Sequence, residues 1–155
     1  SGFLNAKRMP LRSTEEIVVF YKRLPTYNPQ FTEGEPLHGM GTKYKDGNRK
    51  NNNYGNFNST NQASAERVGD TKKYPKSLVT FPRAHSSVML HPTEKPVALM
   101  EWLISTYTNK GETVLDNCMG VGGSGVAARK LERNYIGIEL NQKYFEIAKE
   151  RIEVA

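Results

Sequence analysis

The stretch Val114–Gly125, VLDNCMGVGGSG, decides the fold that this chain adopts. A short apolar run ends on a carboxylate, Asp116, and four glycines then fall within six residues. Three of these glycines, Gly120, Gly122 and Gly125, match the pattern G-x-G-x-x-G. Glycines in that pattern follow a strand, open a helix and let a nucleoside ligand approach the backbone amides at the helix start. The stretch therefore predicts a strand, a loop and a helix that hold a nucleoside cofactor. A turn that uses glycine only for tight packing is the alternative.

The residues around this stretch alternate between helix and strand patterns. Apolar residues recur at helical spacing in PVALMEWLISTYT, 96–108, and ETVLD, 112–116, has the composition of a buried strand. The segment GVAARKLER, 125–133, is helical, and YIGIEL, 135–140, is a second apolar strand. Strand, glycine loop, helix and strand form a βαβ unit, which implies a parallel sheet with a right-handed crossover.

A last helix follows the second strand. Asn141 is a natural N-cap for QKYFEIAKERI, because its side-chain oxygen can accept a hydrogen bond from a free amide of the first turn. One face of this helix carries Phe145, Ala148 and Ile152. The pattern predicts a helix that packs this face on the βαβ unit.

The first half of the chain is less regular. EEIVVFYK, 15–22, is β-branched and aromatic, and SLVTF, 77–81, is a shorter run of the same kind, so both are predicted strands. Between them, residues 43–62 contain seven asparagines in a background of Lys, Gly and Tyr, without a period of 3.6 or 2. We expect an irregular region over residues 31–76, because such a segment has no apolar face to bury.

Composition limits the class of protein. The 155 residues suffice for one domain with a real core. No apolar run approaches the roughly 20 residues that span a bilayer, and the N-terminal residues lack the apolar core of a secretory signal. A single cysteine excludes an internal disulfide and a multi-cysteine zinc site, and no metal site is predicted. We expect a cytoplasmic protein with no membrane partner.

The net charge of +6 is unevenly distributed. Residues 1–30 carry five Lys and Arg against two acids, residues 31–90 carry nine against five, and residues 91–155 carry eight against nine. All of the positive excess therefore lies in the first ninety residues. This division suggests a region that faces a polyanion beside a region that binds a small ligand, with a merely solubilising surface as the alternative.

Asp116 and Glu139 select the nucleoside ligand. Glu139 ends the second strand, where a carboxylate can accept hydrogen bonds from both hydroxyls of a ribose. Asp116 would repel a pyrophosphate in the glycine loop, whereas it would attract a ligand with an ammonium and a sulfonium. S-adenosylmethionine carries both charges and a ribose, and is the predicted cofactor. The alternative is that Asp116 only caps the turn or the helix.

These motifs resemble those of a known enzyme family. VLDNCMGVGGSG together with YIGIEL is similar to the cofactor motifs of the amino-group DNA methyltransferases, which modify adenine or cytosine in DNA. HPTEKPVALMEWLI, 91–104, resembles the motif that precedes the glycine loop in their beta class. Residues 1–22 resemble the segment that follows the catalytic motif there. The resemblance implies an α/β protein with an incomplete Rossmann-like methyltransferase fold, a parallel-rich sheet and a long irregular insertion.

The resemblance also implies roles for individual residues. Thr93 and Lys95 would meet the carboxylate of the cofactor, Asp116 its amino group, and Glu139 its ribose. Val121 and Gly123 depart from the family pattern, which commonly has small hydroxylated residues there. The full predicted cofactor site consists of Thr93, Lys95, Asp116, Cys118, Gly120, Gly122, Ser124 and Glu139.

One motif of the family is missing from the sequence. The enzymes grip the flipped base with a run of the type Asp/Asn/Ser-Pro-Pro-Tyr/Phe, and these 155 residues contain no proline doublet. We therefore assign no catalytic residue. The chain is expected to be the C-terminal portion of a longer enzyme, completed by its missing N-terminal portion or by a second copy, and inactive alone. The alternatives are a catalytically dead nucleic-acid-binding module and an NAD-binding dehydrogenase fragment.

The expected organisation has three parts. Residues 1–30 belong to the catalytic domain, 31–76 are the target-recognition region, and 77–155 bind the cofactor. Double-stranded DNA is the expected partner, with adenine favoured over cytosine as the target, in the setting of restriction–modification. Basic residues that neutralise phosphates are predicted at Lys43, Lys45, Arg49, Lys50, Lys72, Lys73 and Lys76.

Overall fold

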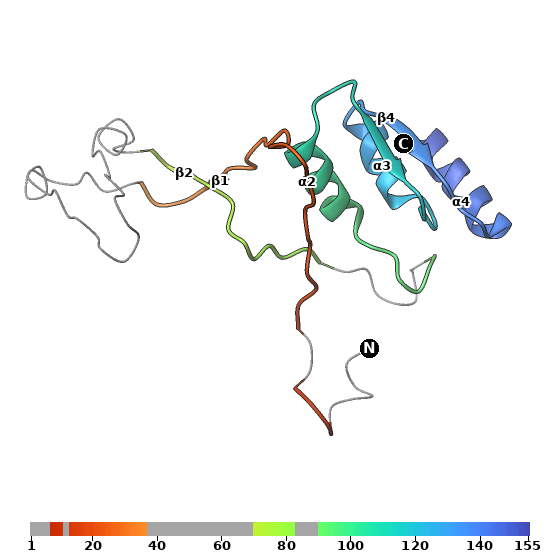
Figure 1. Cartoon of the computed structure of the whole chain (residues 1–155), viewed down its shortest axis with the longest axis horizontal. Coiled ribbons are helices and arrows are strands. Elements are labelled where there is room, and N and C mark those ends of the chain that lie inside the picture. The colour runs from red at the N-terminus through yellow and green to blue at the C-terminus, as the bar shows by residue number, and fades with distance from the viewer. Residues whose placement is uncertain (1–6, 11–12, 37–69, 83–89) are drawn as a thin grey trace, which may run out of the picture.

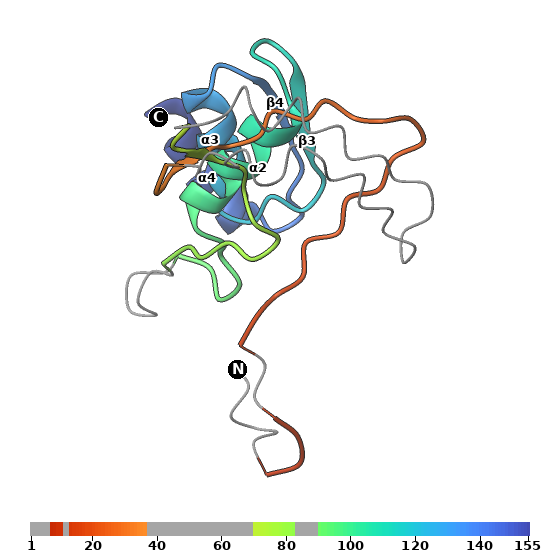
Figure 2. The same ribbon diagram turned by 90° about the vertical axis from the view of Figure 1, so that its left-hand side faces the viewer.

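The computed structural model describes residues 7–10, 13–36, 70–82 and 90–155. Its folded body comprises α2 (Val97–Tyr107), β3 (Thr113–Asp116), α3 (Gly123–Lys130), β4 (Asn134–Gly137) and α4 (Gln142–Glu153). Figure 1 shows these five elements gathered together. Residues 7–10 lie apart from the body in both views (Figures 1 and 2).

The βαβ unit predicted around the glycine loop is present. Strands β3 and β4 pair in parallel, with Thr113 opposite Asn134 and Asp116 opposite Gly137, and α3 connects them. α3 packs against α2 at a core of Ile104, Ala127 and Ala128. Val114 and Tyr135, on the inner face of the strand pair, also pack on this core. The architecture is therefore α/β, as the sequence predicts.

Helix α2 occupies the segment where the helical spacing predicted it. Pro96 is its N-cap, and Thr106 in the last turn is fully buried, with its hydroxyl donating to the Trp102 carbonyl at 2.7 Å. Asn28 reaches across to the end of the helix. Its backbone amide donates to the Thr106 carbonyl at 2.7 Å, and its side-chain amide donates to the Thr108 carbonyl at 3.0 Å. The last carbonyls of a helix accept no hydrogen bond within the helix. Here Asn28 donates to carbonyls at this end, and these bonds attach the N-terminal segment to the body.

Helix α4 begins where the sequence predicts. The Asn141 side chain accepts hydrogen bonds from the backbone amides of Lys143 and Tyr144. Ala148 is fully buried, and it lies against the glycine loop. A Cβ at Gly122 would fall 2.8 Å from the Ala148 Cβ, and one at Gly125 would fall 2.3 Å from the Ile152 Cδ1. The two glycines therefore permit a close approach between the loop and α4 that no larger residue allows.

Several predicted strands need correction. The structure assigns no strand to 15–22 or to 77–81, and the side chains of Val18, Phe20 and Leu78 are exposed. These runs have β propensity but no strand to pair with among the described residues, and propensity alone does not make a sheet. The predicted strand 135–140 ends early, at Gly137. Leu140, the last residue of the predicted strand, is fully exposed.

The sequence predicts a buried strand at 112–116, whereas the strand pair is buried on one face only. Leu115, Ile136 and Ile138 project from the other face, and each is more than half exposed. The irregular region 31–76 contains one short antiparallel ribbon, β1 (Thr32–Glu33) with β2 (Lys72–Lys73), and residues 37–69 lie outside the described part. In Figure 1 this ribbon projects from the α2 side of the body.

No helix in the described part of the chain has the length and apolarity that crossing a bilayer requires.

Substituting Gly122 by alanine tests the close approach of the loop to α4. Gly122 and Gly111 both have positive φ, 77° and 83°, but only Gly122 would place a Cβ against another element. We expect Gly111→Ala to lower the free energy of unfolding by about 1–2 kcal/mol, the cost of a left-handed alanine. Gly122→Ala should lower the free energy of unfolding by about 1–3 kcal/mol more, because its Cβ overpacks against α4. Urea denaturation measures both losses. Equal losses for the two variants would contradict the packing account.

Candidate cofactor site

One open pocket of about 130 Å³ lies between residues 91–95 and the glycine loop. Six of the eight predicted cofactor residues line it: Thr93, Lys95, Asp116, Cys118, Gly120 and Ser124. Gly122 and Glu139 do not. The pocket thus joins the end of β3 and the start of α3 to the turn that leads into α2. This turn lies some twenty residues before the end of β3 in the sequence.

Asp116 stands at the carboxyl end of β3 and faces the start of α3. One carboxylate oxygen accepts from the Cys118 backbone amide at 3.1 Å, and the other accepts from the Ser124 hydroxyl at 2.5 Å. The positive end of the α3 dipole favours a carboxylate in this position. Asp116 therefore caps the turn, one of the two roles considered from the sequence, whereas the start of α3 at Gly122 has no side-chain cap. The same side chain also lines the pocket. A cap and a ligand contact are compatible, because each carboxylate oxygen has two lone pairs.

Glu139 binds the backbone of the glycine loop. One of its oxygens accepts from the Gly120 amide at 2.9 Å, and the other accepts from the Asn141 amide at 2.8 Å. The carboxylate therefore ties the end of the second strand to the loop. Met119 reinforces this connection, since its amide donates to the Ile138 carbonyl at 3.0 Å.

The glycines of the loop serve different purposes. Gly120 lines the pocket with φ 54°, and a Cβ there would meet no protein atom within 4 Å. Gly123 also lines it, with the Lys95 carbonyl 3.6 Å from the position of a Cβ. Gly122 packs on α4 and does not line the pocket, so its contact with a cofactor stays a prediction. Open space at Gly120 leaves room for a ligand beside the backbone.

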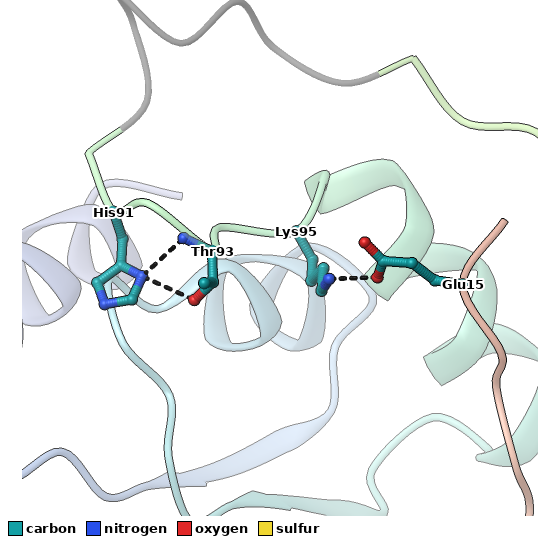
Figure 3. A network of polar contacts seen from close by, with 4 residues as sticks. All are labelled: Glu15, His91, Thr93 and Lys95. Carbon is teal, nitrogen blue, oxygen red and sulfur yellow. Dashed lines mark hydrogen bonds and ion pairs between the residues drawn. The ribbon is translucent and has the colours of Figure 1, made fainter. Parts of the chain in front are cut away.

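The turn before α2 carries a polar network (Figure 3). The Thr93 hydroxyl lies 3.1 Å from the His91 Nδ1, which also accepts from the Thr93 backbone amide at 3.2 Å. The Lys95 ammonium forms an ion pair with the Glu15 carboxylate of the N-terminal segment. This ion pair shows that the Lys95 ammonium is placed to receive a carboxylate.

Tyr135 does not line the pocket but is linked to it through Ser124, which the sequence did not reveal. Its hydroxyl lies 2.9 Å from the Ser124 hydroxyl, which extends the chain of hydrogen bonds from Asp116. Burial is the main cause that raises the pKa of Tyr135 above the ordinary 10.0, and the charge of Asp116 adds to it, while the Ser124 hydrogen bond opposes it. In the sequence, Tyr135 has the position of an inward-facing core residue of a strand. Only its contact with the Ser124 hydroxyl connects it to the pocket.

The remaining walls are apolar or carry charges that pair within the protein. Met100 from α2, and Met119 and Val121 from the loop, supply apolar lining, and Glu94 contributes a carboxylate bound to Arg151. Helical spacing places Met100 on the inner face of α2, but no local signal identifies the other three.

The predicted phosphate-binding residues are only partly described. Lys72 and Lys76 are exposed on or beside β2, and the aliphatic part of Lys73 lies against Gly34. The rings of Phe31 and Tyr74 meet on the same ribbon, with centroids 4.8 Å apart. The other four candidates, Lys43, Lys45, Arg49 and Lys50, lie outside the described residues.

Comparison with known proteins identifies similar sequences. A family model described as DNA methylase matches residues 1–150. Type II methyltransferase M2.DpnII of Streptococcus pneumoniae is 43% identical over 63 residues, which cover 41% of this chain and 24% of that protein. DNA adenine methyltransferase YhdJ of Escherichia coli (strain K12) is 36% identical over 87 residues, which cover 54% of this chain and 30% of that protein. The chain thus spans less than a third of the length of these relatives.

Among solved structures, that of M1.HpyAVI in complex with SAM is 51% identical to this chain, with a TM-score of 0.41. The match covers 42% of this chain and 32% of that one.

The raised pKa of Tyr135 predicts a specific pH dependence of stability. Between the unfolded and the folded pKa the native state retains a proton that the unfolded state has lost, so stability falls as the pH rises above about 10. Tyr135→Phe should show a smaller fall than the wild type in urea denaturation over this range. The exposed Tyr74 provides the matched control, as Tyr74→Phe. An unchanged pH profile in Tyr135→Phe would overturn the assignment.

Proposed function

Because this chain belongs to the DNA methylase family, we propose that its pocket binds S-adenosylmethionine for methylation of the exocyclic amino group of adenine in double-stranded DNA. The observation that supports cofactor binding most directly is the meeting of Asp116, Lys95 and the open Gly120 backbone at one pocket. The name of the relative YhdJ favours adenine over cytosine as the target.

The chemistry of the pocket fits the amino-acid end of this cofactor. Asp116 offers a carboxylate to an ammonium, and Lys95 with Thr93 offers donors to a carboxylate. The Glu15 carboxylate now holds the Lys95 ammonium, so a ligand carboxylate would share or replace that contact. A dinucleotide would instead bring a pyrophosphate toward Asp116, and family membership also argues against the dehydrogenase alternative.

Glu139 takes the ribose in this proposal. Both of its oxygens already accept one backbone hydrogen bond, which fixes the carboxylate plane against the glycine loop. Each oxygen retains a further lone pair for a hydroxyl donor. The loop and the ribose contact would therefore be positioned by the same side chain.

The cofactor supplies a methyl group on a positively charged sulfur. The residues of this chain bind and orient it, since orientation contributes much of the acceleration when the leaving group is already good. The target base must leave the duplex to be reached, and a Pro-Pro-Tyr-type motif would hold its amino group. We place that motif outside these 155 residues, in another part of the enzyme or in a second copy, and we place the enzyme in the cytoplasm.

DNA contact is assigned to the basic first half of the chain. The β1–β2 ribbon carries Lys72 and Lys73 beside the Phe31–Tyr74 ring pair, and Lys76 follows it. Lysines neutralise phosphates, and aromatic rings offer a face on which a displaced base can stack. The ribbon is thus suited to bind a nucleic acid. A catalytically dead nucleic-acid-binding module would have the same property.

Removing the charge of Asp116 should weaken the cofactor. Asp116→Asn keeps an oxygen that caps the Cys118 amide but loses the attraction for an ammonium. We expect the Kd for S-adenosylmethionine to rise about tenfold or more by calorimetric titration, the effect of one charged hydrogen bond. Asp70→Asn is the matched control, because Asp70 caps the Lys72 amide in the same way away from the pocket.

Two outcomes of this titration, and one of a separate methyl-transfer assay, are informative. NAD, as the parallel ligand, should show no binding, and binding of NAD alone would overturn the proposed cofactor. Equal Kd values for Asp116→Asn and Asp70→Asn would remove Asp116 from the ligand site. Transfer of a labelled methyl group to DNA by the 155-residue chain alone would contradict the placement of the base-gripping motif elsewhere.

The ribbon lysines should contribute to DNA binding through charge. Lys72→Ala combined with Lys76→Ala should weaken binding to duplex DNA and lower the slope of log K against log salt by about 2, one for each lost phosphate contact. Fluorescence anisotropy across a salt series measures both quantities. Lys143→Ala with Lys149→Ala removes two exposed lysines from α4 and should leave the slope unchanged. Equal slopes for the two double variants would refute the assignment.

A further inference from the structure

We propose that Arg151 is a positioning residue that fixes the two walls of the cofactor pocket relative to each other, an inference that rests on the proposed function. Arg151 lies in the last turn of α4 and is not among the residues that line the pocket. Its guanidinium acts instead through Glu94 and Val121, which belong to opposite walls.

The Arg151 side chain contacts both walls through a single nitrogen. Nη1 lies 2.9 Å from the Glu94 Oε1 and donates to the Val121 carbonyl at 2.8 Å. The second Glu94 oxygen accepts from the Leu90 amide at 3.1 Å, so the carboxylate is held from both sides. The side chains of Arg151 and Glu94 are 25% and 16% exposed, which distinguishes this pair from the more exposed ion pairs of the described residues.

The two contacted residues are adjacent in sequence to predicted ligand contacts. Glu94 lies between Thr93 and Lys95, and Val121 follows Gly120. A shift of either wall would therefore move donors that the cofactor needs. Because a charged hydrogen bond is directional and partly shielded from water here, it can hold this spacing more firmly than a surface ion pair could.

One face of α4 seats the whole arrangement. Tyr144, Ala148 and Arg151 recur at i, i+4 and i+7, so they line up along one side of the helix. The Tyr144 ring meets the His91 ring at 4.5 Å in an edge-to-face contact, and Ala148 lies against Gly122. The turn at 91–95 thus rests on α4 at two points two helical turns apart, and the glycine loop rests between them.

Arg151→Met tests the proposal, since it removes the charge and both hydrogen bonds while keeping a long apolar side chain. The matched control is Lys149→Met, an exposed position on the same helix. We expect the Kd for S-adenosylmethionine to rise about tenfold in Arg151→Met and to stay unchanged in the control, by calorimetric titration. Arg151→Lys, which keeps the ion pair with Glu94, should recover most of this loss.

A second readout needs no ligand. Hydrogen exchange of the Leu90, Thr93 and Glu94 amides reports how firmly the turn is held, because each donates within it. These amides should exchange about tenfold faster in Arg151→Met, as expected from the loss of one charged hydrogen bond. Glu94→Gln should reproduce the effect, and the double variant Glu94→Gln/Arg151→Met should add nothing to it.

The outcomes separate the two proposals. If the wild-type chain binds no S-adenosylmethionine, the proposed cofactor fails, while the exchange rates still decide whether Arg151 holds the walls. Wild-type exchange in Arg151→Met, or additive losses of affinity in the double variant, would overturn the positioning role. If Arg151→Met does not fold, Glu94→Gln provides the same comparison.

Discussion

The close approach of the glycine loop to α4 is the constraint on which the rest of this structure depends. At Gly122 a Cβ would collide with Ala148, and at Gly125 with Ile152 and Tyr135. Beside this contact, the Arg151 guanidinium of α4 donates to the Val121 carbonyl, and the Glu139 carboxylate, just before α4, accepts from the Gly120 amide. A larger residue at Gly122 would require the loop or α4 to shift, because the nearest atoms are the Cβ and backbone Cα of Ala148. The absence of side chains therefore determines where the polar groups can act.

The polar groups of the pocket are held in place by the protein before any ligand arrives. Asp116 is fixed by the Cys118 amide and the Ser124 hydroxyl, and Glu139 by two backbone amides. Side chains that are already ordered lose little rotamer freedom on binding, so more of the contact energy remains as affinity.

Features set by local sequence could be predicted, whereas those set by tertiary contact could not. The N-cap at Asn141 and the βαβ unit follow from adjacent residues, and the structure contains them. The run at 15–22 has equal strand propensity but no partner among the described residues, so it forms no strand. Gly122 matched a cofactor motif, yet its surroundings show a packing role. Arg151 was invisible in sequence, because its two contacts lie 57 and 30 residues away.

The distribution of charge agrees with a division of tasks along the chain. The pocket brings Asp116 and Glu94 together with Lys95, and Arg151 forms an ion pair with Glu94, so charges of both signs lie there. A zwitterionic ligand needs such balanced, directional contacts, whereas a polyanion needs an excess of positive charge over a wide surface. That excess lies in the first ninety residues. The Lys95–Glu15 ion pair joins the two regions, in addition to the Asn28 hydrogen bonds to the end of α2.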